Sequence, residues 1–194
     1  KVTMILRGYN VEQVRTVAEV LLHSKYVRNM EITLNTDNAY EIIRTISDEY
    51  QDKLNIGAGT VQTYDELVKA VEAGAKFVLS PRQMTIDMLA YCKKKGIVSV
   101  PGSFTPSEIG EQFEMGADIV KVFPANELSL KYAKKVCEPM GNLKLMAVGG
   151  INKENVREAL DSGYKYVGTA GGLFPKDQIM KMDKEKMLIS LKLN

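Results

Sequence analysis

Short apolar runs alternate with amphipathic segments along the whole chain, and this alternation constrains the fold more than any other feature. The apolar runs cover residues 2–7, 28–34, 53–59, 75–80, 96–102, 117–125, 143–150 and 165–171. Segments with helical periodicity lie between them, at 11–24, 39–50, 64–74, 85–96, 106–116, 130–141 and 153–163. Strands that alternate with helices of about 10–15 residues are typical of βαβ units in a parallel sheet. Eight such strands favour an α/β fold of the closed (β/α)8 TIM-barrel type over an open sheet.

The ends of the predicted helices support this division. Thr63 with Glu66 and Thr105 with Glu108 match the capping box, in which the two side chains satisfy free N–H groups of the first turn. Glycines stand where helices of this kind end, at Gly74, Gly96, Gly116 and Gly163. The tail, residues 181–194, is predicted to be a last helix. Because single barrels of about 200 residues are common, we expect one domain over residues 1–194.

Charge and composition argue against several classes of partner. The 194 residues carry a formal net charge of +2, and the lysines are spread along the chain. Nucleic-acid-binding proteins cluster Lys and Arg on one face, so no nucleic-acid partner is expected. No apolar run approaches the roughly 18 residues of a membrane span, and no signal peptide is recognisable. We expect a protein of the cytoplasm with no membrane partner.

The two cysteines and the one histidine do not form a pattern of metal ligands. Cys92 and Cys137 are far apart in helical segments, which predicts neither a disulfide framework nor a zinc site. His23 falls inside the first predicted helix, which argues against a histidine-based triad. We therefore expect neither a metal nor another cofactor.

Charged residues fall on the inner face of three predicted strands. Side chains alternate along a strand, so the apolar residues that face the helices fix which residues face the barrel interior. This parity places Arg7, Glu31 and Lys121 inside, together with Thr33 and Asn35. A buried charge costs several kcal/mol unless it is paired, and stability alone gives no reason to gather three. Active sites of such barrels lie at the carboxyl ends of the strands, where Thr60 is also expected.

The inward lysine suggests a specific chemistry. Burial disfavours the ammonium form and frees the amine, which can attack a ketone and form a Schiff base. The protonated imine then accepts electrons when a neighbouring C–C bond breaks. Proton transfers in this sequence need a carboxylate, and Glu31 is the inward candidate.

Two glycine-rich turns follow the last two predicted strands, at 148–151 and 167–172. Loops at these positions of a (β/α)8 barrel often bind phosphate through backbone N–H groups. Each turn alone is weak evidence, because tight turns also use glycine. Together they favour a phosphorylated substrate.

The motifs resemble those of the class I aldolases of the KDPG/KHG family, which act on 2-keto-3-deoxy-6-phospho-aldonates and 4-hydroxy-2-oxoglutarate. They follow in order through the chain, as ILRG, MEITLNT, IGAGTV, LSP, VPG with TPSE, VKVFPA, AVGGI and VGTAGG. The resemblance implies a homotrimer of (β/α)8 barrels that reversibly cleaves its substrate to pyruvate and glyceraldehyde 3-phosphate.

The same resemblance implies roles for individual residues. Lys121 would form the Schiff base and Glu31 would carry protons, while Thr60 would contact the substrate. Further substrate-binding positions are implied at Arg7, Asn35, Pro101, Phe123, Val148, Gly149, Gly150 and Gly171. Among these, Pro101 and Phe123 would shape the pocket wall, and Gly150 would help to hold the phosphate.

Two positions point to the galactonate type of enzyme. Gluconate-type enzymes generally carry an arginine at the position of Asn35 and a threonine at that of Val148, so the resemblance favours 2-dehydro-3-deoxy-6-phosphogalactonate. Arg7 would then hold the substrate carboxylate, since a bidentate contact needs a guanidinium. The chain departs from the family pattern in two places: Ser129-Leu130 replaces Gly-Pro, and Gly171 replaces a phosphate-binding serine.

Alternatives remain open at this stage. Another phosphate-binding barrel, such as an isomerase, would share the glycine turns but has no need of Lys121. A gluconate-type enzyme or a 4-hydroxy-2-oxoglutarate aldolase would use the same lysine. A catalytically silent sugar-phosphate-binding barrel would keep Lys121 and Glu31 as a structural ion pair.

Overall fold

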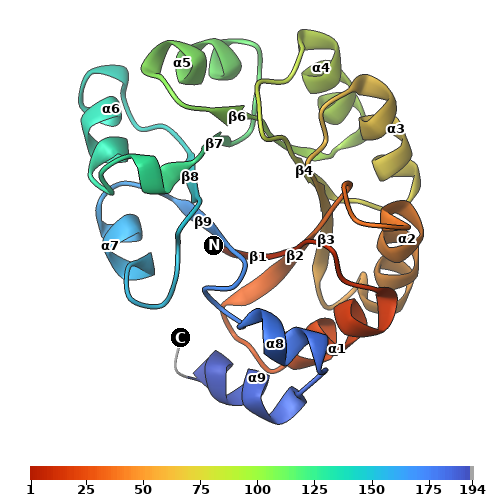
Figure 1. Ribbon diagram of the computed structural model, residues 1–194. Coiled ribbons are helices and arrows are strands. Elements are labelled where there is room, and N and C mark those ends of the chain that lie inside the picture. The colour runs from red at the N-terminus through yellow and green to blue at the C-terminus, as the bar shows by residue number, and fades with distance from the viewer. Residues whose placement is uncertain (193–194) are drawn as a thin grey trace.

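The computed structural model describes residues 1–192 and consists of one parallel sheet surrounded by helices (Figure 1). The strands within this range are β1 (Val2–Leu6), β2 (Val27–Thr33), β3 (Asn55–Gly59), β4 (Phe77–Leu79), β5 (Val98–Val100), β6 (Gly102–Ser103), β7 (Val120–Val122), β8 (Leu145–Val148) and β9 (Tyr166–Thr169). They pair in the order β5-β4-β3-β2-β1-β9-β8-β7-β6. The predicted α/β fold of the (β/α)8 type is confirmed.

The predicted strand at 96–102 is divided in two. β5 pairs with β4 and β6 pairs with β7, so the two edges of the sheet meet at Pro101 and form a nearly closed barrel. Proline has no N–H to donate to a strand ladder. Its carbonyl still accepts a hydrogen bond from the Lys121 N–H at 2.8 Å. The division at Pro101 explains why nine strands occupy residues 1–192 where eight were expected.

The helices lie on the outside of the sheet (Figure 1). They are α1 (Val11–Leu21), α2 (Ala39–Tyr50), α3 (Tyr64–Glu72), α4 (Ile86–Lys95), α5 (Pro106–Glu114), the 3-10 turn η1 (Ala125–Glu127), α6 (Tyr132–Met140), α7 (Val156–Asp161), α8 (Lys176–Met180) and α9 (Lys184–Lys192). Both predicted capping boxes are present, at the starts of α3 and α5. The four predicted C-terminal glycines all have positive φ.

The last two helices, α8 and α9, pack against α1 on the outside of the barrel (Figure 1). The amide of Gln13 donates to the Met180 carbonyl at 3.3 Å, and Lys184 forms an ion pair with Glu19. The predicted tail helix is present as α9 from Lys184 onward, and residues 193–194 lie outside the described part. The five-residue α8 was not predicted.

Apolar side chains pack on both faces of the sheet, in an outer layer against the helices and an inner layer inside the barrel. The outer layer fills the space between sheet and helices and includes the fully buried Val120 and Val122. The inner layer contains Ile5, Phe77, Leu79, Val100, Met146 and Val148. The alternation predicted for β1, β2 and β7 is therefore confirmed, and it places Lys121 and Glu31 on the inner side of the sheet.

Candidate active site

Lys121 is the central residue of β7, between two valines that face the helices. Its side chain points into the barrel and is only 5% exposed. The Nζ atom lies 4.9 Å from the centre of the Phe123 ring, on the same face of the strand. The ammonium therefore lies beside an aromatic wall and has little contact with water.

Glu31 reaches the interior from β2 and is 3% exposed. Its Oε2 atom is buried and has no hydrogen-bond partner among the described residues. A buried carboxylate oxygen without a partner is costly, so stability alone does not explain its retention. Gly59 on β3 makes room for it, because a Cβ at Gly59 would collide with the Glu31 Oε1 atom.

Burial and mutual attraction set the protonation of this pair. Burial raises the pKa of Glu31 to about 7, although the positive charges of Lys121 and Arg7 act in the opposite direction. Burial lowers the pKa of Lys121 to about 8, opposed by the charge of Glu31. No salt bridge joins the two side chains within residues 1–192. Both groups can therefore gain or lose a proton near neutral pH.

Arg7 was predicted to face the barrel interior, but its side chain is exposed. The alternation along β1 is as expected, but Arg7 follows the last residue of the strand and is exposed, so it is not a third buried charge. It still lowers the pKa of both Glu31 and Lys121 through its charge. Asn35, two residues beyond β2, is likewise exposed. These two residues lie at the mouth of the barrel, not in its interior.

Thr60 follows β3 directly and has a left-handed backbone, with φ of 59°. This conformation is costly for a β-branched residue, and such strain gathers at functional sites. The backbone around Thr60 is held by hydrogen bonds from Leu34 N–H to the Gly59 carbonyl and from Val61 N–H to the Leu79 carbonyl. The substrate contact implied for Thr60 stays a prediction.

The expected wall residues surround the lysine. Pro101 is buried beside it in the barrel-closing segment, and Val148 belongs to the inner apolar layer. Phe123 is partly buried and packs against that layer. The site is thus bounded by apolar groups on the strands around β7.

The glycine turns follow β8 and β9 at the same end of the barrel. Gly149 and Gly150 have φ of 111° and 69°, and a Cβ on either would approach Asn126 to 2.8 Å. Substitution at these two positions is therefore strained and crowded. Gly171 differs, because a Cβ there would meet no atom of the described residues within 4 Å.

The sequence predicted the charged pair but missed the role of Gly59. Gly57 and Gly59 share one face of β3, and in the strand register they stand beside Glu31 and Thr33. Two glycines on the inward face of a strand could have indicated a close approach by a side chain from a neighbouring strand.

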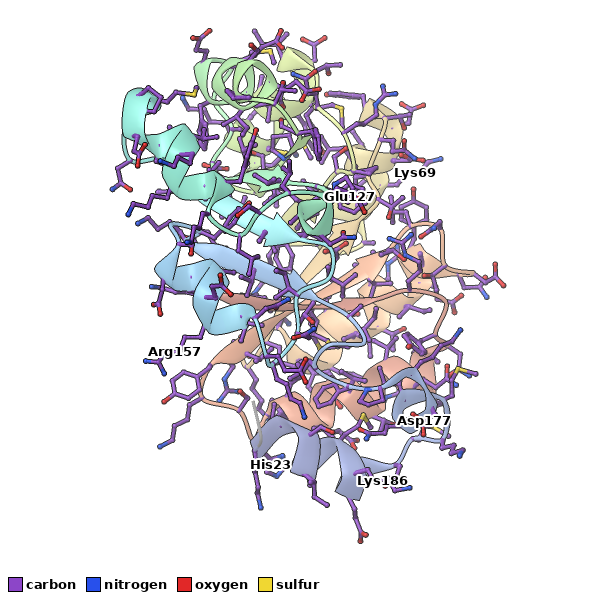
Figure 2. The ribbon with its side chains drawn as sticks, turned by 60° about the vertical axis from the view of Figure 1, so that its left-hand side comes forward. His23, Lys69, Glu127, Arg157, Asp177 and Lys186 are labelled. Carbon is purple, nitrogen blue, oxygen red and sulfur yellow. The ribbon has the colours of Figure 1, made fainter. Side chains whose placement is uncertain are left out.

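Several charged residues and the single histidine lie on the outer surface. Figure 2 shows Lys69, Arg157 and Lys186 widely separated on the outside of the molecule, and His23 near α9, away from the barrel interior. Residues 1–192 contain no group of three His, Cys, Asp or Glu side chains suited to a metal ion. None of the helices in that range is long and apolar enough to cross a membrane.

Comparisons with known proteins agree with this geometry. Residues 1–189 match the aldolase family described as KDPG and KHG aldolase. A relative from Pseudoalteromonas atlantica, named 2-dehydro-3-deoxy-phosphogluconate aldolase, is 34% identical over 83% of this chain and 74% of its own length. The 2-dehydro-3-deoxy-6-phosphogalactonate aldolase of Escherichia coli K12 is 26% identical over 90% of this chain and 84% of its own.

A solved structure shows the same architecture. The KDPG aldolase of Legionella pneumophila, with pyruvate captured as a covalent carbinolamine, superposes with a TM-score of 0.86 at 28% identity. The alignment covers 99% of this chain and 91% of that one. The chain belongs to the KDPG and KHG aldolase family.

Proposed function

We propose that this chain is a Schiff-base aldolase that cleaves a 2-keto-3-deoxy-6-phospho-sugar acid to pyruvate and glyceraldehyde 3-phosphate. The observation that carries the proposal is the buried Lys121, whose pKa is lowered to about 8, facing the same interior as Glu31. A neutral amine in a dry pocket is a nucleophile toward a ketone. The pyruvate carbinolamine named for the Legionella pneumophila relative supports this chemistry.

The reaction begins when Lys121 Nζ attacks the C2 carbonyl of the substrate. The resulting carbinolamine loses water to give a protonated imine. The C4 hydroxyl then gives up its proton and the C3–C4 bond breaks, with its electron pair moving toward the imine nitrogen. The aldehyde leaves, the enamine takes a proton at C3, and water hydrolyses the imine to release pyruvate.

Glu31 is the proton carrier in this proposal. Its pKa of about 7 lets it accept a proton from one intermediate and return it to the next at neutral pH. Its Oε2 atom has no hydrogen-bond partner among residues 1–192, which leaves it to bond with a substrate or a water molecule.

The remaining substrate contacts are assigned by position. Arg7 at the mouth would hold the carboxylate of the keto acid with Asn35 beside it, and Thr60 would contact the same part of the substrate. Pro101, Phe123 and Val148 would form the apolar wall. The turns with Gly149, Gly150 and Gly171 would offer backbone N–H groups to the phosphate.

The galactonate-type substrate is favoured over the gluconate type because of Asn35 and Val148. Relatives of both names match the chain. 4-Hydroxy-2-oxoglutarate is the second candidate, since a relative named KHG/KDPG aldolase also matches the chain. One aldolase domain over residues 1–194, assembly as a homotrimer and a place in the cytoplasm belong to the same proposal.

The test is intact-mass spectrometry after incubation with pyruvate and borohydride, followed by peptide mapping. We expect one reduced pyruvyl adduct on Lys121, and none in a folded Lys121→Ala variant. Absence of an adduct in folded wild-type protein would favour the catalytically silent barrel. Initial rates with the galactonate and gluconate epimers then determine the stereochemistry at C4.

A further inference from the structure

The turn after β8 carries N–H groups that donate to no atom of residues 1–192. Gly149, Gly150 and Ile151 follow the strand directly, and the N–H groups of Gly150 and Ile151 have no hydrogen-bond acceptor in that range. Ile151 is only 5% exposed. Buried backbone N–H groups nearly always have a partner. Two successive donors of this kind in one turn are suited to binding an anion.

Asn155 holds this turn through both ends of its amide. Its Nδ2 atom donates to the Gly150 carbonyl at 2.9 Å, and its Oδ1 atom accepts from the Asn152 N–H at 2.9 Å. The peptide between Gly150 and Ile151 is trans, so its carbonyl and its N–H point in opposite directions. Because the Gly150 carbonyl is turned toward Asn155, the Ile151 N–H points away from that side chain.

Thr169, the last residue of β9, holds the next peptide of the turn. Its side chain is buried, and its Oγ1 atom donates to the Ile151 carbonyl at 2.6 Å. Gly172 allows this approach, because a Cβ there would collide with the Ile151 carbonyl oxygen and would lie 2.5 Å from Thr169 Oγ1. One hydroxyl group thus joins the end of β9 to the turn after β8.

The turn needs such bonds because its glycines do not fix its conformation. Gly149 and Gly150 both have positive φ, and glycine moves among backbone conformations more readily than any other residue. The carbonyl oxygens of Gly150 and Ile151 are acceptors that would repel an anion, and each is bonded to a side-chain donor. Without the Thr169 hydroxyl, the Ile151 carbonyl would have no partner, and the turn could adopt other conformations.

We propose that Thr169 is a positioning residue of the aldolase reaction. Its hydroxyl, together with Asn155, fixes the turn after β8 so that the N–H groups of Gly150 and Ile151 are presented to the phosphate of the aldehyde half. The proposal deepens the proposed function and rests on it. Thr169 acts through the Ile151 carbonyl and does not touch the substrate. Donors that are already ordered bind an anion more tightly than donors that must be ordered on binding.

The test measures KM in the synthetic direction, with saturating pyruvate and either glyceraldehyde 3-phosphate or uncharged glyceraldehyde. Thr169→Val keeps the shape of the side chain and removes the hydroxyl. In this variant we expect KM for glyceraldehyde 3-phosphate to rise about 10-fold, since hydrogen bonds to the charged phosphate are weakened. KM for glyceraldehyde should change less than about 3-fold, because a neutral aldehyde forms no charge-assisted bond with the turn. Thr169→Ser, which retains the hydroxyl, should keep the wild-type ratio of the two KM values.

Thr16→Val is the matched control. Thr16 is also buried, and its Oγ1 atom donates to the Glu12 carbonyl at 2.8 Å, so this variant loses the same kind of bond on α1. It should leave the ratio of the two KM values unchanged. Asn155→Ala is a second test of the turn, because it leaves the Gly150 carbonyl without its side-chain donor. It should raise KM for glyceraldehyde 3-phosphate selectively, and it decides the matter alone if Thr169→Val does not fold.

The possible failures are distinguishable. An unchanged ratio of the two KM values in Thr169→Val, or a selective rise that Thr169→Ser does not restore, would overturn the positioning role. Borohydride trapping of pyruvate on Lys121 involves no phosphate, so in the same variants it reports on the aldolase chemistry separately. Trapping with an unchanged ratio would remove only the assignment of Thr169, while absence of trapping in folded wild-type protein would remove the proposed function.

Discussion

The carboxylate of Glu31 occupies the space that a side chain at Gly59 would need. A Cβ at Gly59 would collide with Oε1 and would lie 2.7 Å from the Cγ atom of Glu31. The two residues come from neighbouring strands, β2 and β3. The absence of a side chain at Gly59 therefore allows Glu31, the proposed proton carrier, to lie where it does.

Gly59→Ala is expected to displace the Glu31 carboxylate. Moving a general acid/base out of reach of the substrate removes a contribution of about 10²–10⁴-fold, so we expect kcat to fall by at least about 10-fold. Overpacking of a buried site costs about 1–3 kcal/mol of unfolding free energy. Steady-state kinetics and denaturant unfolding measure the two effects.

The matched stability control is Gly171→Ala, because a Cβ at Gly171 meets nothing within 4 Å. In a double-mutant cycle, Glu31→Ala should relieve most of the destabilisation caused by Gly59→Ala, since the colliding atoms are gone. Additive losses in that cycle would show that the two side chains do not compete for space.

The stability of the protein should depend on pH through Glu31. The folded pKa of about 7 lies above the ordinary value of 4.5, so the folded state holds its proton more tightly than the unfolded chain. Between pH 4.5 and 7, wild type should therefore lose about 3 kcal/mol of stability relative to Glu31→Gln, which does not titrate. Urea unfolding of both proteins across this range measures the difference. Parallel curves would mean that Glu31 is not protonated in the folded state at these pH values.

Arg7→Ala should change both binding and proton affinity. We expect KM for pyruvate to rise about 10-fold, because a charge-assisted contact with the carboxylate is lost. The charge of Arg7 lowers the pKa of both Glu31 and Lys121, so its removal should raise both and move the pH dependence of pyruvate trapping to higher pH. Arg28→Ala, near the start of β2, is the control. An unchanged KM would place the carboxylate elsewhere.

The features that the sequence could predict are those with a local period. Strand alternation identified Lys121 and Glu31 as inward residues, because every second side chain of a strand faces the same way. The capping boxes of α3 and α5 follow from residues three apart. Such patterns depend only on residues close together in the chain, so they can be recognised in a single sequence.

The features that the sequence could not predict depend on contacts between segments that are distant in the chain. Arg7 lies on the expected side, yet its exposure depends on how far β1 extends and on the loops around its end. The fit of Glu31 over Gly59 joins residues from two strands. Pro101 divides its strand because each half pairs with a different neighbour. The sequence contains a local sign of only one of these relationships, the two glycines on the inward face of β3.

Gly171→Ser tests the phosphate side of the proposed site. The family pattern has a serine here, and the position has room for one, since Gly171 is exposed and no atom lies within 4 Å of a Cβ. A new hydroxyl within reach of the phosphate should lower KM for glyceraldehyde 3-phosphate about 3–10-fold, the effect of one added hydrogen bond, and leave KM for uncharged glyceraldehyde unchanged. Gly171→Ala adds the Cβ without the hydroxyl, so its comparison with Gly171→Ser isolates the effect of the hydroxyl. If serine and alanine behave alike with both aldehydes, the turn after β9 does not hold the phosphate, and the turn after β8, with Gly149 and Gly150, remains the proposed phosphate site.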